Sequence, residues 1–241
     1  SIPTISSSVY TGQISVVSNV TIRAMAMAPG MSASRVHSAS YVFNAGSGAF
    51  MDARDGQMYP YVKIGSQTWM GKNLNYKVDN SWCYQESEKN CETYGRLYQW
   101  SAVMGLEPTY NSTLWRKALP HQGICPSGWH VPSDAELTNL TDTLMQSTAA
   151  VKKLKANSPL WNYSPEREGT DDYGFSLLPA GYKNENNTFI SIGHYACLWS
   201  ASEVSASNAW PRYINGADIV GFSRNSFYKF EGLSLRCIRD N

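Results

Sequence analysis

The chain of 241 residues is long enough for one or two domains, and its 20 basic and 19 acidic residues leave a net charge of +1. Neither this balance nor any local run of Lys and Arg provides a field that would recruit nucleic acid or an anionic membrane. With 16% charged and 12% aromatic residues, the composition is that of a folded domain and excludes a disordered chain.

Residues 1–44 alternate with the period of β-strands. Three strand candidates, 13–16, 20–27 and 36–43, are separated by Ser-Asn and Pro-Gly-Met turns. Three strands are enough for at best half of a β-sandwich. We therefore predict a partial all-β accessory module of Ig-like sandwich type over 1–44. The sequence starts as if cut from the middle of this module. We expect either a processed fragment or an upstream part of the same protein, with the missing strands and a targeting signal, that assembles with it.

A short linker and a second domain follow. Residues 45–50 are small and flexible, which is typical of a linker, and the second domain is predicted over 51–241. Residues 59–64 and 67–70 form a predicted hairpin that turns at a Gly-Ser pair. The later half of 94–104 is predicted to form a short helix.

The stretch from Cys125 to Glu136 predicts a corner at which a strand meets a helix. A Pro-Ser-Gly turn is followed by Trp-His-Val, which has strand character, and then by Pro-Ser-Asp-Ala-Glu. Ser133 is placed as the N-cap of a helix near 133–147, and Glu136 completes a capping box with it. A second helix is predicted over 149–156.

The remainder of the chain is predicted to be strand and loop. Its strand candidates are residues 175–178, 196–200, 208–214 and 233–238. Hairpins and helices that precede closing strands indicate an α+β fold with antiparallel strands, because a parallel sheet would show βαβ alternation.

The five cysteines show no Cys-x-x-Cys spacing and no nearby His pair, which argues against structural zinc. We predict two disulfides, Cys83 with Cys91 across a hairpin-like loop and Cys125 with Cys237 across more than a hundred residues. Cys197 remains as a buried thiol in an apolar run. The sequence contains no run of about 18 apolar residues, so no membrane span is predicted. Disulfides and composition together predict a secreted or cell-surface protein.

The segment from residue 203 to residue 231 is the best candidate for a binding surface. It combines aromatic rings, which stack on sugars or apolar partners, with amides and guanidinium groups, which give directed hydrogen bonds. The strand period also predicts that about half of its aromatic side chains face the core. The predicted ligand-binding residues are Asn208, Trp210, Arg212, Tyr213, Asn215, Asp218, Arg224, Asn225 and Tyr228, with Phe222, Phe227 and Lys229 as neighbours.

Catalytic and metal motifs are scarce. The four histidines are far apart in sequence, and no nucleophile-elbow, Walker or zincin motif is present. His130 is interpreted as a hydrogen-bonded structural residue. Asp171 and Asp172 are candidate oxygen ligands for calcium. The alternative is a turn in which an Asp accepts backbone N–H bonds and no cofactor is needed, and we favour it.

Several stretches in one order resemble a known family. From residue 52 to residue 240 the chain is similar to the Fibrobacter succinogenes major paralogous domain, in residues 52–57, 64–70, 73–76, 94–98, 125–136, 169–175, 178–181, 199–200 and 234–240. Residues 9–12, 21–26 and 38–41 resemble landmarks of the small sandwich at the C-terminus of chitobiase and hexosaminidase enzymes. These resemblances imply a C-type-lectin-like domain on secreted or surface proteins of bacteria, behind a non-catalytic spacer.

We therefore expect a non-enzymatic adhesion or binding module that recognises an extracellular glycan or protein. Three alternatives stay open. A structural subunit of a surface appendage would bind copies of itself through exposed strand edges. A variable receptor-binding domain would diversify mainly at 208–230. An enzyme similar to the formylglycine-generating enzymes, whose helix corner resembles residues 131–137, would need an accessible reduced Cys197 or a bound metal.

Overall fold

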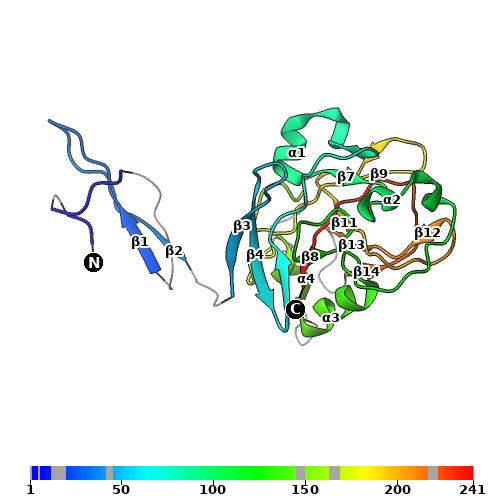
Figure 1. Cartoon of the computed structure of the whole chain (residues 1–241). Helices are drawn as coiled ribbons and strands as arrows, with labels where there is room; N and C mark the ends of the chain where they lie inside the picture. Colours follow the sequence, from blue (N-terminus) through cyan, green and yellow to red (C-terminus); the bar gives the residue numbers. More distant parts are fainter. Residues whose placement is uncertain are drawn as a thin grey trace. The chain divides into compact units, whose positions relative to one another are not determined.

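The computed structural model describes residues 2–4, 6–11, 20–41, 46–144, 150–162, 169–216 and 222–240. It divides into two compact units, Ser1–Ser47 and Gly48–Asn241. In the first unit β1 (Val20–Ala24) and β2 (His37–Tyr41) form an antiparallel hairpin, as the sequence predicted (Figure 1). The strand predicted at 13–16 lies outside the described residues. A two-stranded hairpin is marginally stable by itself, which fits an incomplete sandwich.

The second unit is built on a five-stranded antiparallel sheet. Its strands are β3 (Gly48–Met51), β4 (Met58–Ile64), β5 (Gln67–Met70), β8 (Trp129–His130) and β16 (Ile238–Arg239). Their order is β3-β4-β5-β16-β8, so the last of them in sequence lies between two earlier ones. The predicted hairpin at 59–70 corresponds to β4 and β5. β3 begins inside the segment 45–50 that was assigned to the linker.

The sheet curls until its two edge strands approach each other. Phe50 of β3 stacks on Trp129 of β8 with ring centroids 4.8 Å apart, although these strands lie at opposite ends of the sheet order. Tyr61 of β4 also contacts Trp129, at 6.2 Å. Aromatic rings therefore close the curled sheet across the gap that hydrogen bonds leave open.

The other strands are short and form small antiparallel groups. β11 (Tyr195–Leu198), β13 (Arg212–Asn215) and β14 (Ser223–Arg224) form a three-stranded sheet. The two-stranded pairs are β6 (Ser81–Trp82) with β7 (Leu97–Tyr98), β9 (Tyr182–Lys183) with β10 (Phe189–Ile190), and β12 (Asn208–Ala209) with β15 (Phe227–Tyr228).

The helices are few and short. They are α1 (Glu88–Tyr94), α2 (Trp100–Val103), α3 (Asp134–Leu144) and α4 (Ala150–Leu154), with 3-10 turns η1 (Tyr84–Glu86) and η2 (Pro108–Asn111). In Figure 1, α1 and α3 lie at opposite ends of the second unit. The molecule is thus a mixed α+β protein with mostly antiparallel strands, and none of the described helices is long and apolar enough to cross a membrane.

Three of the predicted strands differ from the structure. The strand at 208–214 is interrupted at Pro211, which has no N–H for a continuous ladder, and it becomes β12 and β13. Residues 175–178 form only a bridge between Leu177 and Lys155. Residues 233–238 bridge to several different partners, so only Ile238 and Arg239 form a strand.

Two disulfides link segments of the second unit. Cys125 is bonded to Cys237, 112 residues later, and Cys83 is bonded to Cys91. Both predicted pairings are present. The shorter loop is not hairpin-like, however, because it contains η1 and the start of α1. Disulfides persist in oxidising compartments, which favours an extracellular protein.

The helix corner has the predicted capping box. The Glu136 N–H donates to Ser133 Oγ at 3.1 Å, and the Ser133 N–H donates to Glu136 Oε2 at 2.7 Å. The α3 face behind this cap buries Leu137 and Leu140 completely, together with Trp69 of β5, in one of the apolar clusters of the core. The capping box therefore fixes α3 against the curled sheet.

Candidate functional site

β13 separates the predicted ligand-binding residues onto two faces. Arg212 and Ile214 point toward the core and are buried, whereas Tyr213 and Asn215 point to the other face and are half-buried. This alternation is the ordinary period of a strand. The predicted set therefore does not form one continuous surface.

Arg212 is not available to a ligand, because it is only 3% exposed and its guanidinium group is hydrogen-bonded to residues of α3. Its Nη1 donates to the carboxylate of Asp134, the first residue of α3, and its Nη2 donates to Thr138 Oγ1 at 2.6 Å. Asp134 also suits the positive end of the helix dipole. Arg212 thus holds β13 against α3.

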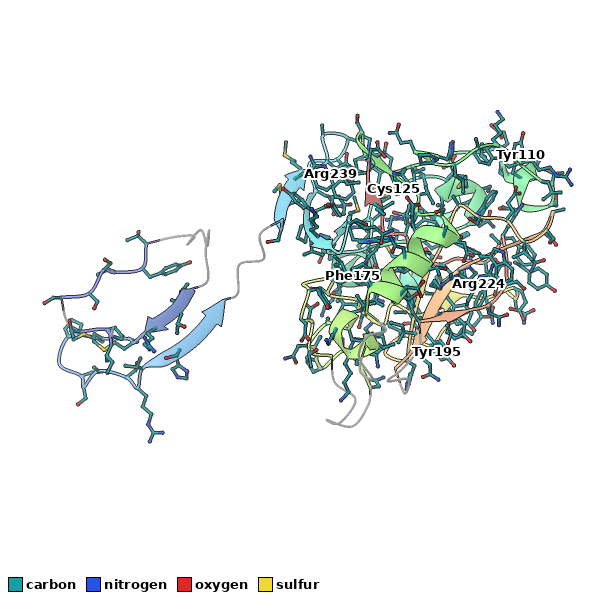
Figure 2. All side chains as sticks on the ribbon, turned by 90° about the horizontal axis from the view of Figure 1, so that it is seen from below. Tyr110, Cys125, Phe175, Tyr195, Arg224 and Arg239 are labelled. Carbon is teal, nitrogen blue, oxygen red and sulfur yellow. A yellow bond between two sulfur atoms is a disulfide. The ribbon has the colours of Figure 1, made fainter. Side chains whose placement is uncertain are left out.

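Arg224 lies on the same side and is exposed. It is the Cα partner of Arg212, it pairs with Asp134 Oδ2 at 3.0 Å, and its guanidinium carbon lies 3.4 Å from the ring centroid of Trp210. Figure 2 shows Arg224 beside α3. Because the ring and the carboxylate hold the guanidinium in place, Trp210 and Arg224 form a fixed surface platform.

A second exposed pair lies at the end of β15. Tyr228 is 46% exposed and stacks on Phe230, which is 40% exposed, with centroids 5.1 Å apart and planes at 10°. Asn208 is the Cα partner of Tyr228. Asn225 is exposed, and its side-chain oxygen accepts the Ser226 N–H. We call Asn208, Trp210, Arg224, Asn225, Tyr228 and Phe230 the outer surface.

Lys229 and Phe222 are buried neighbours of the outer surface. Lys229 is 0% exposed, and its Nζ pairs with Glu203 at 2.6 Å and donates to the carbonyls of Tyr110 and Ala206. Burial alone would raise the pKa of Glu203, but the hydrogen bonds from Lys229 and from two backbone N–H groups leave this pKa below its usual value. Lys229 therefore ties three loops together beneath the surface.

Tyr213, on the other face, belongs to a group of four rings that includes Phe227. We call Tyr182, Tyr195, Tyr213 and Phe227 the aromatic ring cluster. Only Tyr213 and Phe227 lie in the segment that sequence analysis selected. Asn215 shares this face, and the predicted Asp218 lies outside the described residues. Of the six aromatic residues between residues 203 and 231, only Phe222 is buried, which is fewer than the half that the strand period predicts.

A buried carboxyl group lies next to the aromatic ring cluster. Glu231 is 5% exposed, and its Oε2 accepts the Tyr228 N–H at 2.8 Å. Burial, with the nearby carboxyl of Glu185, raises the pKa of Glu231 to about 7. Burial, with the charges of Glu231 and Glu185 among others, also raises the pKa of Tyr182 to about 12. Sequence reasoning missed this carboxyl group, since a glutamate beside a glycine gives no signal of burial.

Asp171 stabilises a turn. Its Oδ1 accepts the Ser176 N–H at 2.7 Å, and its Oδ2 accepts the Ser176 hydroxyl at 2.5 Å. Asp172 is exposed. Among the described residues, the one set with metal-ligand spacing is Cys83, Glu88 and Cys91, whose two cysteines are bonded to each other. Asp171 thus accepts a backbone N–H, as the favoured alternative to calcium expected, but the donor lies five residues later and the contact is not an Asx turn, which would use the N–H two residues later.

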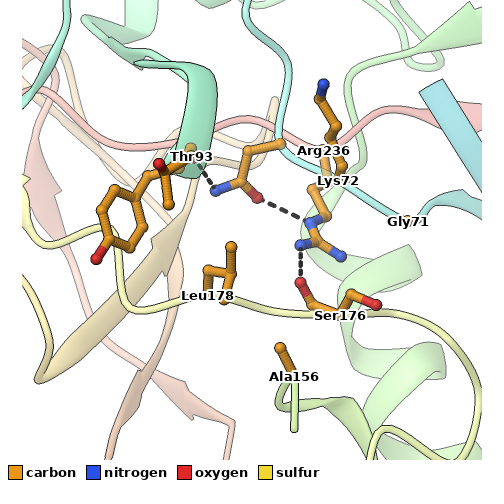
Figure 3. A pocket seen from close by; sticks show the side chains of 9 residues that line it. Gly71, Lys72, Thr93, Ala156, Ser176, Leu178 and Arg236 are labelled. Carbon is orange, nitrogen blue, oxygen red and sulfur yellow. Dashed lines mark hydrogen bonds between the residues drawn. The ribbon is translucent and has the colours of Figure 1, made fainter. Parts of the chain in front are cut away.

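A pocket of about 180 Å³ lies between the sheet and the loop after Asp171 (Figure 3). At its floor, Arg236 donates from Nε to Asn73 Oδ1 at 2.8 Å and from Nη2 to the Ser176 carbonyl, while Asn73 donates to the Tyr94 carbonyl. Burial lowers the pKa of Arg236 to about 9. The pocket is smaller than the ~300 Å³ typical of ligand sites, and its floor connects four segments of the chain.

His130 and Cys197 do not form a catalytic pair. His130 lies between Glu136 Oε1, at 2.9 Å, and Asp240 Oδ1, at 2.6 Å, which fits the predicted structural role. Cys197 is 1% exposed, and burial raises the pKa of its thiol far above the ordinary value. A thiol in that state is neither ionised nor accessible.

Together, the curled sheet, the capped helix and the two disulfides define a disulfide-bonded α+β domain. The family model described as the Fibrobacter succinogenes major domain matches residues 62–239, and the chain belongs to this family. The family model of the chitobiase/beta-hexosaminidase C-terminal domain matches residues 1–38. No curated protein and no solved structure matches the chain.

Proposed function

We propose that the chain is a non-enzymatic binding module of a secreted or surface-exposed bacterial protein, that its second unit has a C-type-lectin-like fold, and that its outer surface recognises a glycan. The observation that carries this proposal is a pair of fixed aromatic groups on that surface: the exposed Tyr228 stacked with Phe230, and the half-buried Trp210 beneath the exposed Arg224. Flat rings stack on the apolar faces of sugars, and nearby amides and guanidinium groups bond to hydroxyls.

Three further features support the proposal. The loop-rich region after α4 contributes every residue of the outer surface, while the curled sheet and the Cys125–Cys237 disulfide support it from behind. Binding residues are commonly placed on loops that a rigid scaffold positions. The buried, protonated Cys197 gives no support to the alternative of a thiol enzyme.

The test is binding of the full chain to a broad glycan array, with and without calcium, beside a Tyr228→Ala/Phe230→Ala variant. We expect selective binding by the parent chain and at least a tenfold loss in the variant. Met58→Ala is the control, because Met58 is 54% exposed on β4 and the change removes exposed apolar surface away from the proposed site.

Two results would count against the proposal. Equal binding by the parent chain and the Tyr228→Ala/Phe230→Ala variant would move the site away from the outer surface. Absence of any glycan binding under both conditions would reject the glycan and leave a protein partner or a structural role.

A further inference from the structure

The aromatic ring cluster closes on itself. Successive ring centroids are 6.4 Å apart for Tyr182 and Tyr195, 6.1 Å for Tyr195 and Tyr213, 6.2 Å for Tyr213 and Phe227, and 5.7 Å for Phe227 and Tyr182. Tyr182 meets both of its neighbours nearly edge-on, at 68° and 71°. The other two pairs are tilted, at 31° for Tyr195 with Tyr213 and 49° for Tyr213 with Phe227. We call this closed circuit of four rings the box.

The strands hold this box in place. Its four residues come from β9, β11, β13 and β15, and the pairing of β11 with β13 sets Tyr195 and Tyr213 on one face. Cys197 is the Cα partner of Tyr213 and lies on that same face, fully buried. All four rings are half-buried, so each contacts the core and is also open to solvent.

Carboxyl groups accompany the box. Glu231 is buried and accepts the N–H of Tyr228, the residue after Phe227, and the charges of Glu231 and Glu185 contribute, after burial, to the raised pKa of Tyr182. Lys183 is the nearest lysine in sequence, but its Nζ lies 3.7 Å from the Trp82 ring centroid. In the part of the chain that the structure describes, no Lys or Arg lies over the rings of Tyr182, Tyr213 or Phe227.

We propose that the aromatic ring cluster, with Glu231, is a binding site for an alkylated ammonium group, such as the trimethylammonium of choline. The negative faces of aromatic rings attract a cation within about 6 Å of their centroids, and a group at the middle of this circuit lies within that reach of all four. The methyl groups of such a cation contact the rings, and Glu231 supplies the opposite charge.

This site is separate from the outer surface. Phe227 and Tyr228 are consecutive residues of β15, and their side chains therefore point to opposite faces of the strand. The glycan proposal and the ammonium proposal can consequently fail independently, since each depends on a different one of these two residues.

The test compares choline with its neutral carbon isostere, 3,3-dimethylbutan-1-ol, by calorimetry on the full chain at pH 8. We expect saturable choline binding and at least tenfold weaker binding of the isostere, because only the charge differs. Phe227→Leu keeps the apolar volume but removes one π face, so it should weaken choline binding at least fivefold. Phe227→Tyr should retain it, and Tyr228→Ala should leave it unchanged.

Glu231→Gln tests the charge. It keeps an acceptor for the Tyr228 N–H and removes the carboxylate, and it should weaken choline binding severalfold at pH 8 but little at pH 5. Near-ultraviolet circular dichroism of each variant verifies its fold. Equal binding of choline and the isostere, unchanged binding by Phe227→Leu, or no saturable choline binding would each overturn the proposal.

Discussion

His130 is held between two carboxylates, and this arrangement makes stability depend on pH. Burial alone would lower the pKa of His130, but hydrogen bonds to Glu136 and Asp240 raise it above its usual value. The pKa of Glu136 is lowered: burial opposes the shift, but hydrogen bonds from His130 and Ser133 outweigh it. The His130 contribution is fully present below its unfolded pKa and is lost as pH rises through its folded pKa. The contribution of Glu136 to stability is present above its unfolded pKa and is lost as pH falls through its lower folded pKa.

We predict that His130→Asn lowers the free energy of unfolding by ~1–2 kcal/mol between about pH 4.5 and 6.5, where both charges are present. The difference from the parent chain should shrink above this window. The share from Asp240 is small, because its side chain is 53% exposed and solvent screens it. Urea unfolding at a series of pH values measures the effect, and a difference that does not change with pH would show that His130 contributes only packing.

The pKa of Glu231 is raised, in the opposite direction to the lowered pKa of Glu136. Its folded pKa of about 7 is above the ordinary value for a glutamate, so the folded state binds this proton more tightly, and stability is lost as pH rises from about 4.5 through 7. We predict that Glu231→Gln stabilises the chain by ~1–2 kcal/mol at pH 8 and has little effect at pH 4. Thermal unfolding at both pH values is the measurement, and a destabilised variant at pH 8 would contradict the shift.

At the scale of elements, α3 and β13 depend on each other through Asp134. We predict that Asp134→Asn costs ~2–3 kcal/mol, because it leaves the buried Arg212 without its carboxylate. It should also weaken any binding at the outer surface, since Arg224 loses the same partner. Asp142→Asn is the control: Asp142 is exposed on the same helix, and a change there should be nearly neutral. Guanidinium unfolding of both variants distinguishes them.

Local signals in the sequence were sufficient for some elements. The capping box at Ser133 and Glu136 and the hairpin of β4 and β5 are read from neighbouring residues, and both are present. α1 was missed because its buried residues Cys91 and Tyr94 are too few to show helical periodicity. The strand at 175–178 did not form because its backbone meets one bridging partner instead of a ladder.

In the candidate site, too, features that depend on neighbouring residues could be predicted, and features that depend on distant segments could not. Arg212 was selected for its chemistry, although strand period places it on the face of Ile214 and thus toward the core. The aromatic ring cluster could not be found from sequence, because its members are spread from residue 182 to residue 227. Only the strand pairings bring them together.

At the scale of the whole molecule, the long disulfide is expected to matter most. In the chain-entropy model, Cys125→Ser/Cys237→Ser should cost ~4–5 kcal/mol, because the closed loop spans 112 residues. Cys83→Ser/Cys91→Ser, with a separation of 8, should cost ~2–3 kcal/mol. Denaturant unfolding of the two variants measures which disulfide contributes more to stability. A larger loss of stability in the Cys83→Ser/Cys91→Ser variant would contradict the prediction.

The position of β16 inside the sheet has a consequence for synthesis. Residues 238–239 are made after every other strand of the sheet, yet they lie between β5 and β8. Until they leave the ribosome, the β5 edge and the Trp129–His130 segment have no partner, and an open edge of this kind invites pairing with other chains. The five-stranded sheet therefore cannot close before residues 238–239 have been released, and until then the β5 edge is the part of the second unit most exposed to pairing with other chains.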